Sequence, residues 1–168
     1  MKTNLLVLAI LFISSFVLQS CQEEVTSPSS DGKEQVIQKT SGMSNGQITS
    51  ATILTDDKNR NHWEVKVDMP GDGGIVKFEY TIDTQVLRQV KGLTPSFNYE
   101  IEPGNSLIAY SSAKAIALNA VNGDIIEWKV EKDESDNQWQ YRFEIISSGS
   151  NYEVRIDATN GTVIRIKN

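Results

Sequence analysis

One stretch of the chain spells the Gly-x-Ser-x-Gly pattern that holds the nucleophile of many serine hydrolases. It runs from Gly42 to Gly46 with Ser44 at its centre, and His62 is the only histidine that could act as a general base. The nucleophile turn needs a strand before it and a helix after it. Here a helical segment precedes the serine and an alternating strand pattern follows it, so we interpret these residues as a helix end. The sequence predicts no catalytic residues and no enzyme.

Oxygen-bearing side chains recur at alternate positions in two places, which is the spacing of a calcium-binding EF-hand loop. The first series is Asp57, Asn59, Asn61 and Asp68, and the second is Asp133, Ser135, Asn137 and Glu144. The glycine that such a loop needs at its sixth position is replaced by His62 and Gln138, and strand-like alternation follows. We therefore interpret both series as polar hairpin loops, and we expect no metal site and no cofactor.

Three tryptophans, Trp63, Trp128 and Trp139, could stack on a ligand. Each lies in phase with the apolar positions of an alternating segment, where buried packing is the commoner role of tryptophan. We predict that all three belong to the core. The sequence therefore assigns no binding residue.

The N-terminus has the pattern of an export signal. Lys2 is followed by an apolar run from Leu5 to Leu18, which falls short of the ~20 residues that a membrane-spanning helix needs. Leu18-Gln19-Ser20-Cys21 resembles the lipobox at which bacterial lipoproteins are cleaved and lipidated, although Gln19 departs from the usual small residue. We predict a signal peptide over residues 1–20 and a lipid on Cys21. Cys21 is the only cysteine, so no disulfide can form within the chain.

The charge of the chain limits the class of its partners. The net charge is −6, and loss of Lys2 with the signal would make it −7. An acidic chain has no basic field with which to displace the counterions of nucleic acid, and it is not drawn to anionic lipid head groups. We expect attachment to a membrane through the lipid on Cys21, in the cell envelope, facing the periplasm or the cell exterior.

The chain beyond the signal shows an internal repeat. Residues 21–32 are polar and indicate a flexible tether. Four blocks then recur in the same order and at a nearly constant spacing, which favours a duplicated unit. The matched blocks are Asn45-Gly46 with Asn122-Gly123, the segment from Trp63 with that from Trp139, the segment from Phe78 with that from Tyr152, and the segment from Val86 with that from Val163.

Each unit has the pattern of one helix followed by strands. In the second unit Ala113, Ile116, Ala117, Ala120 and Val121 form one apolar helical stripe, with Ser111 or Ser112 as a potential cap. The strands alternate apolar and polar residues, with Ile126, Val163 and Ile166 among those expected to face the core. We predict the α+β class, with two repeated units that each pack a helix on an antiparallel meander of about four strands.

The segment from Tyr152 to Val163 (YEVRIDATNGTV) resembles the end of a PepSY domain, and Ala113 to Leu118, Gly123 and Trp128 resemble its helix and first strand. The resemblance extends from Leu107 to Lys167. We therefore predict a PepSY domain over residues 105–168, a linker over 93–104 and a degenerate PepSY-like unit over 33–92. PepSY domains occur in peptidase propeptides and in exported bacterial proteins, and they are not catalytic.

The resemblance implies an exported, non-enzymatic lipoprotein that binds another protein of the envelope and restrains or modulates a peptidase. A different class stays open at this stage. The protein could carry a small ligand or a peptide in a groove between helix and sheet or between the units. An apolar pocket open to solvent would favour the carrier, and a packed core with an exposed sheet face would favour a protein partner.

Overall fold

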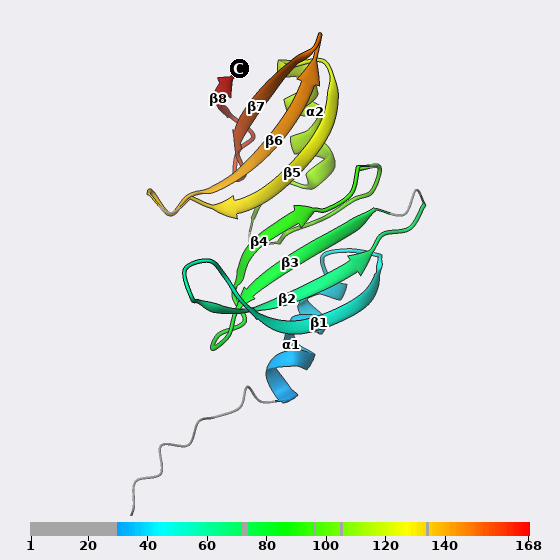
Figure 1. Cartoon of the computed structure of the whole chain (residues 1–168), viewed down its shortest axis with the longest axis vertical. Coiled ribbons are helices and arrows are strands. Elements are labelled where there is room, and N and C mark those ends of the chain that lie inside the picture. Colours follow the sequence, from blue (N-terminus) through cyan, green and yellow to red (C-terminus); the bar gives the residue numbers. More distant parts are fainter. Residues whose placement is uncertain (1–29, 72–73, 96, 105, 134) are drawn as a thin grey trace, which may run out of the picture.

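The computed structural model describes residues 30–71, 74–95, 97–104, 106–133 and 135–168. The order of elements is a helix and four strands, followed by a second helix and four strands (Figure 1). The helices are α1 (Ser30–Ser41) and α2 (Tyr110–Ala120). The strands are β1 (Gln47–Thr55), β2 (Asn61–Asp68), β3 (Ile75–Thr81), β4 (Leu87–Gly92), β5 (Asp124–Lys132), β6 (Trp139–Ser147), β7 (Ser150–Asp157) and β8 (Val163–Lys167).

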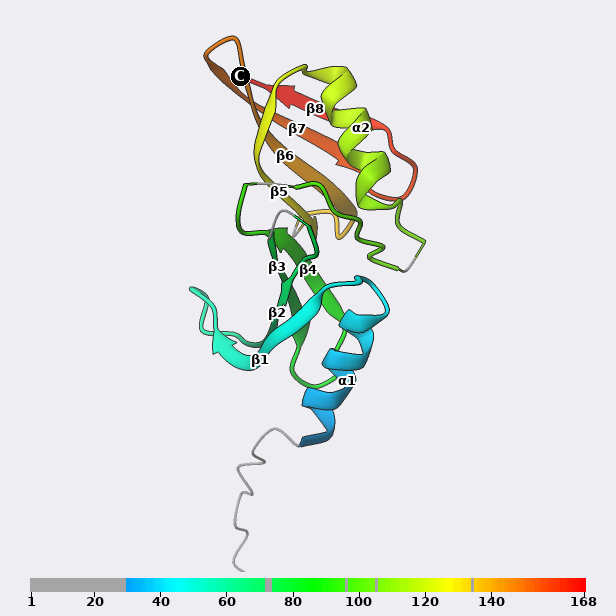
Figure 2. The same cartoon turned by 90° about the vertical axis from the view of Figure 1, so that its right-hand side faces the viewer.

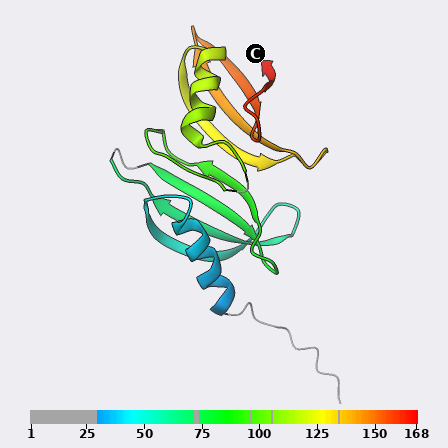
Figure 3. The ribbon, with the colours of Figure 1, turned by 180° about the vertical axis from the view of Figure 1, so that it is seen from behind.

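The strands form one antiparallel sheet of eight, in which each strand pairs with the next along the chain. Both helices pack on the same face of this sheet, α1 against β1 and β2, and α2 against β6 and β7. Figure 3 shows the two helices in front of the sheet, and Figure 2 shows them after a quarter turn. Neither of the helices in the described residues covers the opposite side of the sheet, and we call that side the helix-free face.

One apolar row under the helices shows why this sequence forms the sheet. Val65, Phe78, Val90 and Val130 lie opposite one another on four neighbouring strands, and all four are fully buried. In β3 every second residue is buried and the residues between are half-exposed. That period of two follows from a sheet with one covered and one solvated face, so the prediction of an α+β antiparallel fold is confirmed.

The two predicted units are joined more closely than expected. β4 and β5 pair from Gln89 opposite Glu131 to Gly92 opposite Trp128, so the sheet runs without a break from the first half to the second. A Cβ on Gly92 would collide with the indole nitrogen of Trp128. Because Gly92 has no side chain, the two strands can pair closely while the Trp128 indole lies between them and the linker that follows β4. The prediction of two repeated units, each a helix on its own meander of about four strands, is not confirmed, because the halves share one eight-stranded sheet.

The connection between β4 and α2 packs on the core. Phe97 and Ile101 are buried, and the ring of Tyr99 lies stacked on Tyr110, with 5.5 Å between centroids. Tyr110 in turn lies 4.2 Å from Trp128 between centroids, and the Trp128 indole donates a hydrogen bond of 2.9 Å to the Tyr99 hydroxyl. This aromatic cluster, made from the connection, α2 and β5, fixes the second half against the seam.

Three details of the second half differ from the predictions. Ser111 and Ser112 do not cap α2; the helix begins at Tyr110, and the Glu100 carboxylate accepts the Ser111 backbone N–H at 3.0 Å. Ile126 is 41% exposed, because the β5–β6 register shifts between Ile125 and Glu127. Val163 and Ile166 were expected in the core, but they are 38% and 49% exposed since β8 is the outermost strand.

The halves match in their register as well as in their order of elements. β1 has an irregularity between Ile48 and Ser50, and β5 has one between Ile125 and Glu127. The β3–β4 register shifts next to Tyr80, and the β7–β8 register shifts next to Ile156. Each half therefore interrupts its pairing at the same two places.

Aligning these irregularities gives the residues that correspond between the halves. Trp63 of β2 corresponds to Tyr141 of β6, so the sequence-based match of Trp63 with Trp139 was two positions out of register. One matched pair from each strand is Ala51 with Trp128, Val65 with Phe143, Phe78 with Val154, and Val90 with Ile166.

Within the described residues, no helix is both long and apolar enough to cross a bilayer.

Candidate functional site

The helix-free face carries a continuous row of positive charges. From β2 to β8 each strand contributes one basic side chain that lies directly opposite the basic side chain of the next strand. This basic row consists of Lys66, Lys77, Lys91, Lys129, Arg142, Arg155 and Arg165. Like charges placed opposite one another in a sheet repel, so the row requires compensation from the residues beside it.

Acidic side chains on the same face supply that compensation. Lys77 lies 3.4 Å from Glu64 and 2.8 Å from Glu79. Across the seam Lys91 of β4 pairs with Glu127 of β5 at 2.9 Å. Further pairs along the row are Lys129–Glu131 at 2.6 Å, Arg142–Glu153 at 2.8 Å and Arg155–Glu153 at 2.7 Å. The face is therefore a lattice of ion pairs rather than a one-signed patch.

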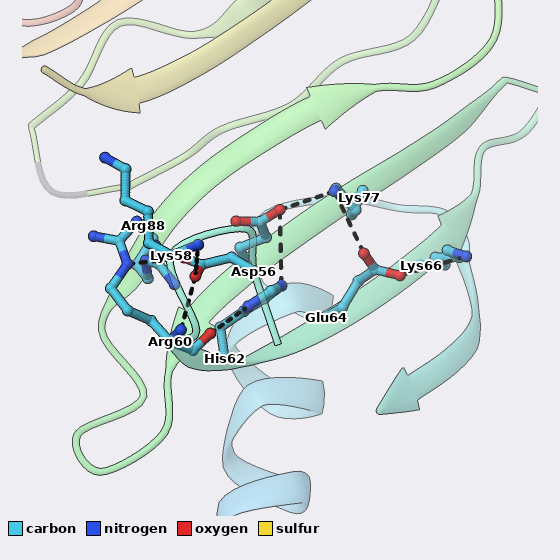
Figure 4. A network of polar contacts seen from close by, with 9 residues as sticks. Asp56, Lys58, Arg60, His62, Glu64, Lys66, Lys77 and Arg88 are labelled. Atoms are coloured by element: carbon cyan, nitrogen blue, oxygen red, sulfur yellow. Dashed lines mark hydrogen bonds and ion pairs between the residues drawn. The ribbon is translucent and has the colours of Figure 1, made fainter. Parts of the chain in front are cut away.

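The most enclosed part of this lattice lies on β2 and β3 (Figure 4). His62 and Glu64 are buried, and His62 Nε2 lies 4.0 Å from a carboxylate oxygen of Glu79. Burial lowers the pKa of Lys77, but the hydrogen bond to Glu79 and the charges of Glu79 and Glu64 outweigh it and raise that pKa above its usual value. Lys77 therefore stays charged between two carboxylates.

His62, Glu64 and Glu79 are also a possible metal-ligating set, since one ligand atom from each lies within 4.8 Å of the others. One imidazole and two carboxylates suit a zinc ion. The Lys77 ammonium, however, contacts both carboxylates, so it occupies the position where a divalent cation would neutralise them. The four residues fit an internal ion-pair cluster better than a metal centre.

Two hairpin loops stand at the edges of this face. In the β1–β2 loop the Asp56 carboxylate accepts backbone N–H groups of Lys58 at 3.0 Å and Arg60 at 2.8 Å, and Arg88 of β4 reaches it at 3.3 Å. The hydrogen bonds from Arg60, Arg88 and Lys58 hold the pKa of Asp56 well below its ordinary range. Asp56 thus fixes the loop and links it to β4.

The β5–β6 loop is built in the same way. Asp133 accepts the backbone N–H of Ser135 at 2.8 Å, and Arg155 of β7 approaches it at 3.9 Å. Hydrogen bonds from Ser135 and Gln140 lower the pKa of Asp133. In each half of the described chain, a carboxylate therefore ties a hairpin loop to a later strand, Asp56 to β4 and Asp133 to β7.

A groove of about 770 Å³ lies between these loops at the seam of the halves. Its walls come from the β1–β2 loop, the end of β3 and start of β4, and the β5–β6 loop, and most of its lining side chains are charged or polar. They include Asp56, Arg60, Arg88, Glu131 and Asp133. The groove therefore presents fixed charges of both signs where the ends of these strands meet at the seam. We call this feature the seam groove.

The residues singled out in the sequence have the following positions. Ser44 follows α1, where its hydroxyl donates to the Thr40 carbonyl, whereas His62 lies on the helix-free face. No serine–histidine pair forms from them. Trp63 and Trp128 are buried as predicted, but Trp139 is only half-buried, with the Lys132 ammonium 6.0 Å from its ring. Cys21 and the predicted signal peptide lie outside the described residues.

The calcium-like spacing does not assemble a site. Asp68 lies at the far end of β2 from the loop, and a strand of that length extends over ~20 Å. Glu144 pairs with Arg142 within β6. The hairpin-loop interpretation accounts for both series.

Sequence reasoning missed the basic row and the seam groove. The signal for the row was present, since charged residues alternate with the apolar ones in most strands, as in Glu64-x-Lys66 and Lys77-x-Glu79. The seam groove could not be found in this way, because it depends on the pairing of β4 with β5.

Comparison with known proteins gives one family match. Residues 107–167 match the PepSY family model, described as "Peptidase propeptide and YPEB domain", so the resemblance predicted for this segment is confirmed. Among solved structures, a "putative lipoprotein" from Clostridium difficile 630 is 19% identical, with 80% of this chain and 88% of that chain covered and a TM-score of 0.38. A likeness of that size carries no argument. No curated protein matches the chain.

Proposed function

We propose, from the PepSY domain at residues 107–167, that this chain is a non-enzymatic lipoprotein of the cell envelope that binds another protein. The family match supports an exported protein whose PepSY domain binds other proteins rather than catalysing a reaction. The lipobox-like Cys21 supports an anchor outside the cytoplasm. The tether was predicted over residues 21–32, but α1 already begins at Ser30, so the residues between Cys21 and Ser30 would join the folded part to the membrane.

We propose the helix-free face, centred on the seam groove, as the surface that the partner contacts. The observation that carries this proposal is the uncovered sheet face with its groove of about 770 Å³ between two fixed loops. Its charged walls suit a protein surface better than an apolar small ligand. The helix-covered face is packed with buried side chains such as Tyr110, Trp128 and Phe143, which leaves less room there for the carrier alternative.

A peptidase is the partner class that the family description suggests. The words "peptidase propeptide" belong to the family, and a propeptide-like domain acts by covering or holding a protease. We therefore propose that the chain modulates a peptidase of the envelope. Addition of the purified chain to secreted protease would then change the rate of casein hydrolysis, and an unchanged rate would remove the peptidase from the proposal.

The domain limits follow from the same proposal. We propose that residues 33–92 are a degenerate PepSY-like copy, joined by residues 93–104 to the PepSY domain at 105–168. The matched irregularities in β1 and β5, and those at β3–β4 and β7–β8, support an ancestral duplication.

Photo-crosslinking in intact cells tests the proposed surface. A photoreactive residue in place of Asp57, which lines the seam groove, should crosslink to one envelope protein. The same residue in place of Glu34, which is exposed on α1 on the other side of the sheet, is the matched control. Equal crosslinking from both positions, or none from Asp57, would refute the groove as the contact surface.

The anchor has its own test. Mass spectrometry of the mature protein should show an acylated Cys21, and Cys21→Ser should release the protein from the membrane fraction. Retention of the Cys21→Ser protein on the membrane would refute the lipid anchor.

A further inference from the structure

The outermost strand of the second half exposes an unpaired edge. β8 pairs with β7 on one side only, and it is the last strand of the sheet. All five of its residues are exposed. Its large aliphatic side chains Val163, Ile164 and Ile166 are 38%, 53% and 49% exposed. A free edge with exposed aliphatic side chains is a template for another strand.

The first half shows what such an edge can accept. β4 corresponds to β8 in register, and β4 is covered by β5. Val90 of β4 is fully buried, whereas Ile166 at the corresponding position of β8 is half-exposed. The same kind of strand is therefore completed by a neighbour in one half and left open in the other.

The charges on β8 indicate the chemistry of a neighbour. Arg165 and Lys167 lie opposite Arg155 and Glu153, so both point to the helix-free face, while Ile166 lies opposite Val154 on the core side. At the seam the corresponding Lys91 is paired with Glu127 of the neighbouring strand at 2.9 Å. Within the described residues, Lys167 has no ion pair of this kind. A strand added beside β8 would supply it through an acidic side chain.

On its core side, β8 also has partly exposed apolar side chains beside it that an added strand could cover. A Cβ at Gly161 would meet Ile116 of α2 and Ile108, so these side chains stand beside the turn that leads into β8. Both are only partly buried. Together with Val163 and Ile166 they would be covered by apolar side chains of an added strand.

We infer that β8 binds an extended segment of a partner protein as an additional antiparallel strand, in which acidic side chains alternate with apolar ones. The acidic side chains face Arg165 and Lys167, and the apolar ones cover Val163 and Ile166. Backbone hydrogen bonds to the free edge supply affinity, and the alternation supplies selectivity. This inference deepens the proposed function, because it assumes that the chain acts by binding another protein.

A synthetic peptide tests the inference without knowledge of the partner. The probe is a capped, fluorescently labelled peptide of alternating glutamate and valine, and its control is the same peptide with lysine in place of glutamate. Fluorescence anisotropy with the full mature chain should show binding of the glutamate peptide at least about tenfold tighter than binding of the lysine peptide. Equal affinity for the two peptides, or none for either, would overturn the inference.

Charge reversal on β8 separates strand recognition from general charge effects. The double variant Arg165→Glu and Lys167→Glu should lose at least about tenfold in affinity for the glutamate peptide and gain affinity for the lysine peptide. Lys33→Glu, at an exposed position of α1, changes charge away from β8 and from the seam groove and should leave both affinities unchanged. A loss as large in Lys33→Glu would show attraction to net charge alone and would also overturn the inference.

Hydrogen exchange reports where the peptide binds. The amides of β8 should become protected when the glutamate peptide is added, while those of the opposite edge strand β1 should not. Ile166→Asp should abolish the protection, and Ile146→Asp, which alters a side chain 43% exposed on β6, should not. Protection of β1 instead of β8 would overturn the inference.

Two further outcomes concern what binds the free edge of β8. Sedimentation that showed a dimer broken by Ile166→Asp would assign the edge to a second copy of this chain and overturn the peptide inference. If the peptide binds β8 but Asp57 gives no crosslink in cells, the edge inference stands and the seam-groove proposal fails. The reverse result would leave the seam groove and remove the β8 site.

Discussion

Corresponding positions in the two halves of the sheet form the same ion pairs with the charges exchanged. In the first half the pairs are Glu64–Lys66, Glu64–Lys77 and Lys77–Glu79, at 3.4, 3.4 and 2.8 Å. In the second half they are Arg142–Glu144, Arg142–Glu153 and Glu153–Arg155, at 2.8, 2.8 and 2.7 Å. The positions correspond in the register alignment of β2 with β6 and of β3 with β7.

The exchange shows that the geometry of the sheet determines which positions form an ion pair, but not which of the two positions is basic. Residues two apart on one strand, and residues on adjacent strands, come close enough to pair whichever member is basic. The basic row then arises because the exchanged halves are joined at the seam, where Lys91 lies opposite Lys129. What differs between the halves is enclosure: Glu64 is 8% exposed and its counterpart Arg142 is 32% exposed.

The largest difference between the halves is expected at the end of the fourth strand. Gly92→Ala places a methyl group against the Trp128 indole and 2.7 Å from the Tyr99 hydroxyl, and such overpacking costs about 3 kcal/mol. Asn168, at the corresponding position after β8, is exposed, and Asn168→Ala should change the free energy of unfolding by less than about 0.5 kcal/mol. Urea titration measures both. Similar values would mean that the seam is not packed as described.

Alkaline titration compares the halves through their buried tyrosines. Burial raises the pKa of Tyr80 to about 12, partly offset by the Thr40 hydrogen bond, and burial also raises the pKa of Tyr99, Tyr110 and Tyr141. A raised pKa in the folded state leaves stability intact below pH 10 and removes it as pH rises, because the unfolded chain ionises first.

Tyr80→Phe should therefore flatten the loss of stability between pH 10 and about 12, by at most about 2.7 kcal/mol at the upper end. Tyr99 and Tyr110 belong to the aromatic cluster, and Tyr141 lies 6.3 Å from Trp128 between ring centroids, so the Tyr80→Phe variant should still unfold in alkali through these three. Circular dichroism against pH follows the transition. If Tyr80→Phe and wild type lost equal stability between pH 10 and about 12, that result would contradict the burial of Tyr80.

Breaking the exchanged ion pairs should have a smaller effect on the free energy of unfolding. Glu64→Gln leaves Lys66 and Lys77 with one carboxylate fewer in an enclosed position, and we expect a loss of about 2 kcal/mol. Arg142→Gln acts at a more open position and should cost about 1 kcal/mol or less. Thermal unfolding of both variants, in low and high salt, checks the order. A larger cost for Arg142→Gln would show that enclosure does not distinguish the halves.

Sequence patterns predicted the helices and strands of this fold better than they predicted which of these elements lie next to one another. The apolar stripe through Ala113 and Ala117 predicted α2, and alternation predicted the strands, because both depend on residues close in the chain. The joining of β4 to β5 depends on Gly92 opposite Trp128, and Gly92 alone indicates only a turn. Likewise the alternation of β8 predicts a core-facing Ile166 but cannot show that no strand covers it.

The same limit applies to the candidate site. His62, Glu64 and Glu79 come from two strands, so their convergence requires the β2–β3 register, in which Glu64 lies opposite Glu79. Sequence reasoning identified His62 only as a possible general base. The groove walls come from three separate loops and strands, and no local pattern relates those segments to one another.

The smallest effect tests whether the first-half cluster can be converted into a metal site. Lys77→Met removes the ammonium that contacts Glu64 and Glu79 and leaves one imidazole and two carboxylates within 4.8 Å. Zinc at ten times its dissociation constant should then stabilise the variant by about 1.4 kcal/mol, and wild type by less.

The second half supplies the matched control for this conversion, since the position of His62 is taken by Gln140 and that of Lys77 by Glu153. Glu153→Met removes the corresponding side chain but leaves no imidazole, so zinc should not stabilise that variant. Thermal unfolding with and without zinc, reversed by a chelator, measures the difference. Equal stabilisation of Lys77→Met and wild type would mean that Lys77 does not keep a cation out of the first-half cluster.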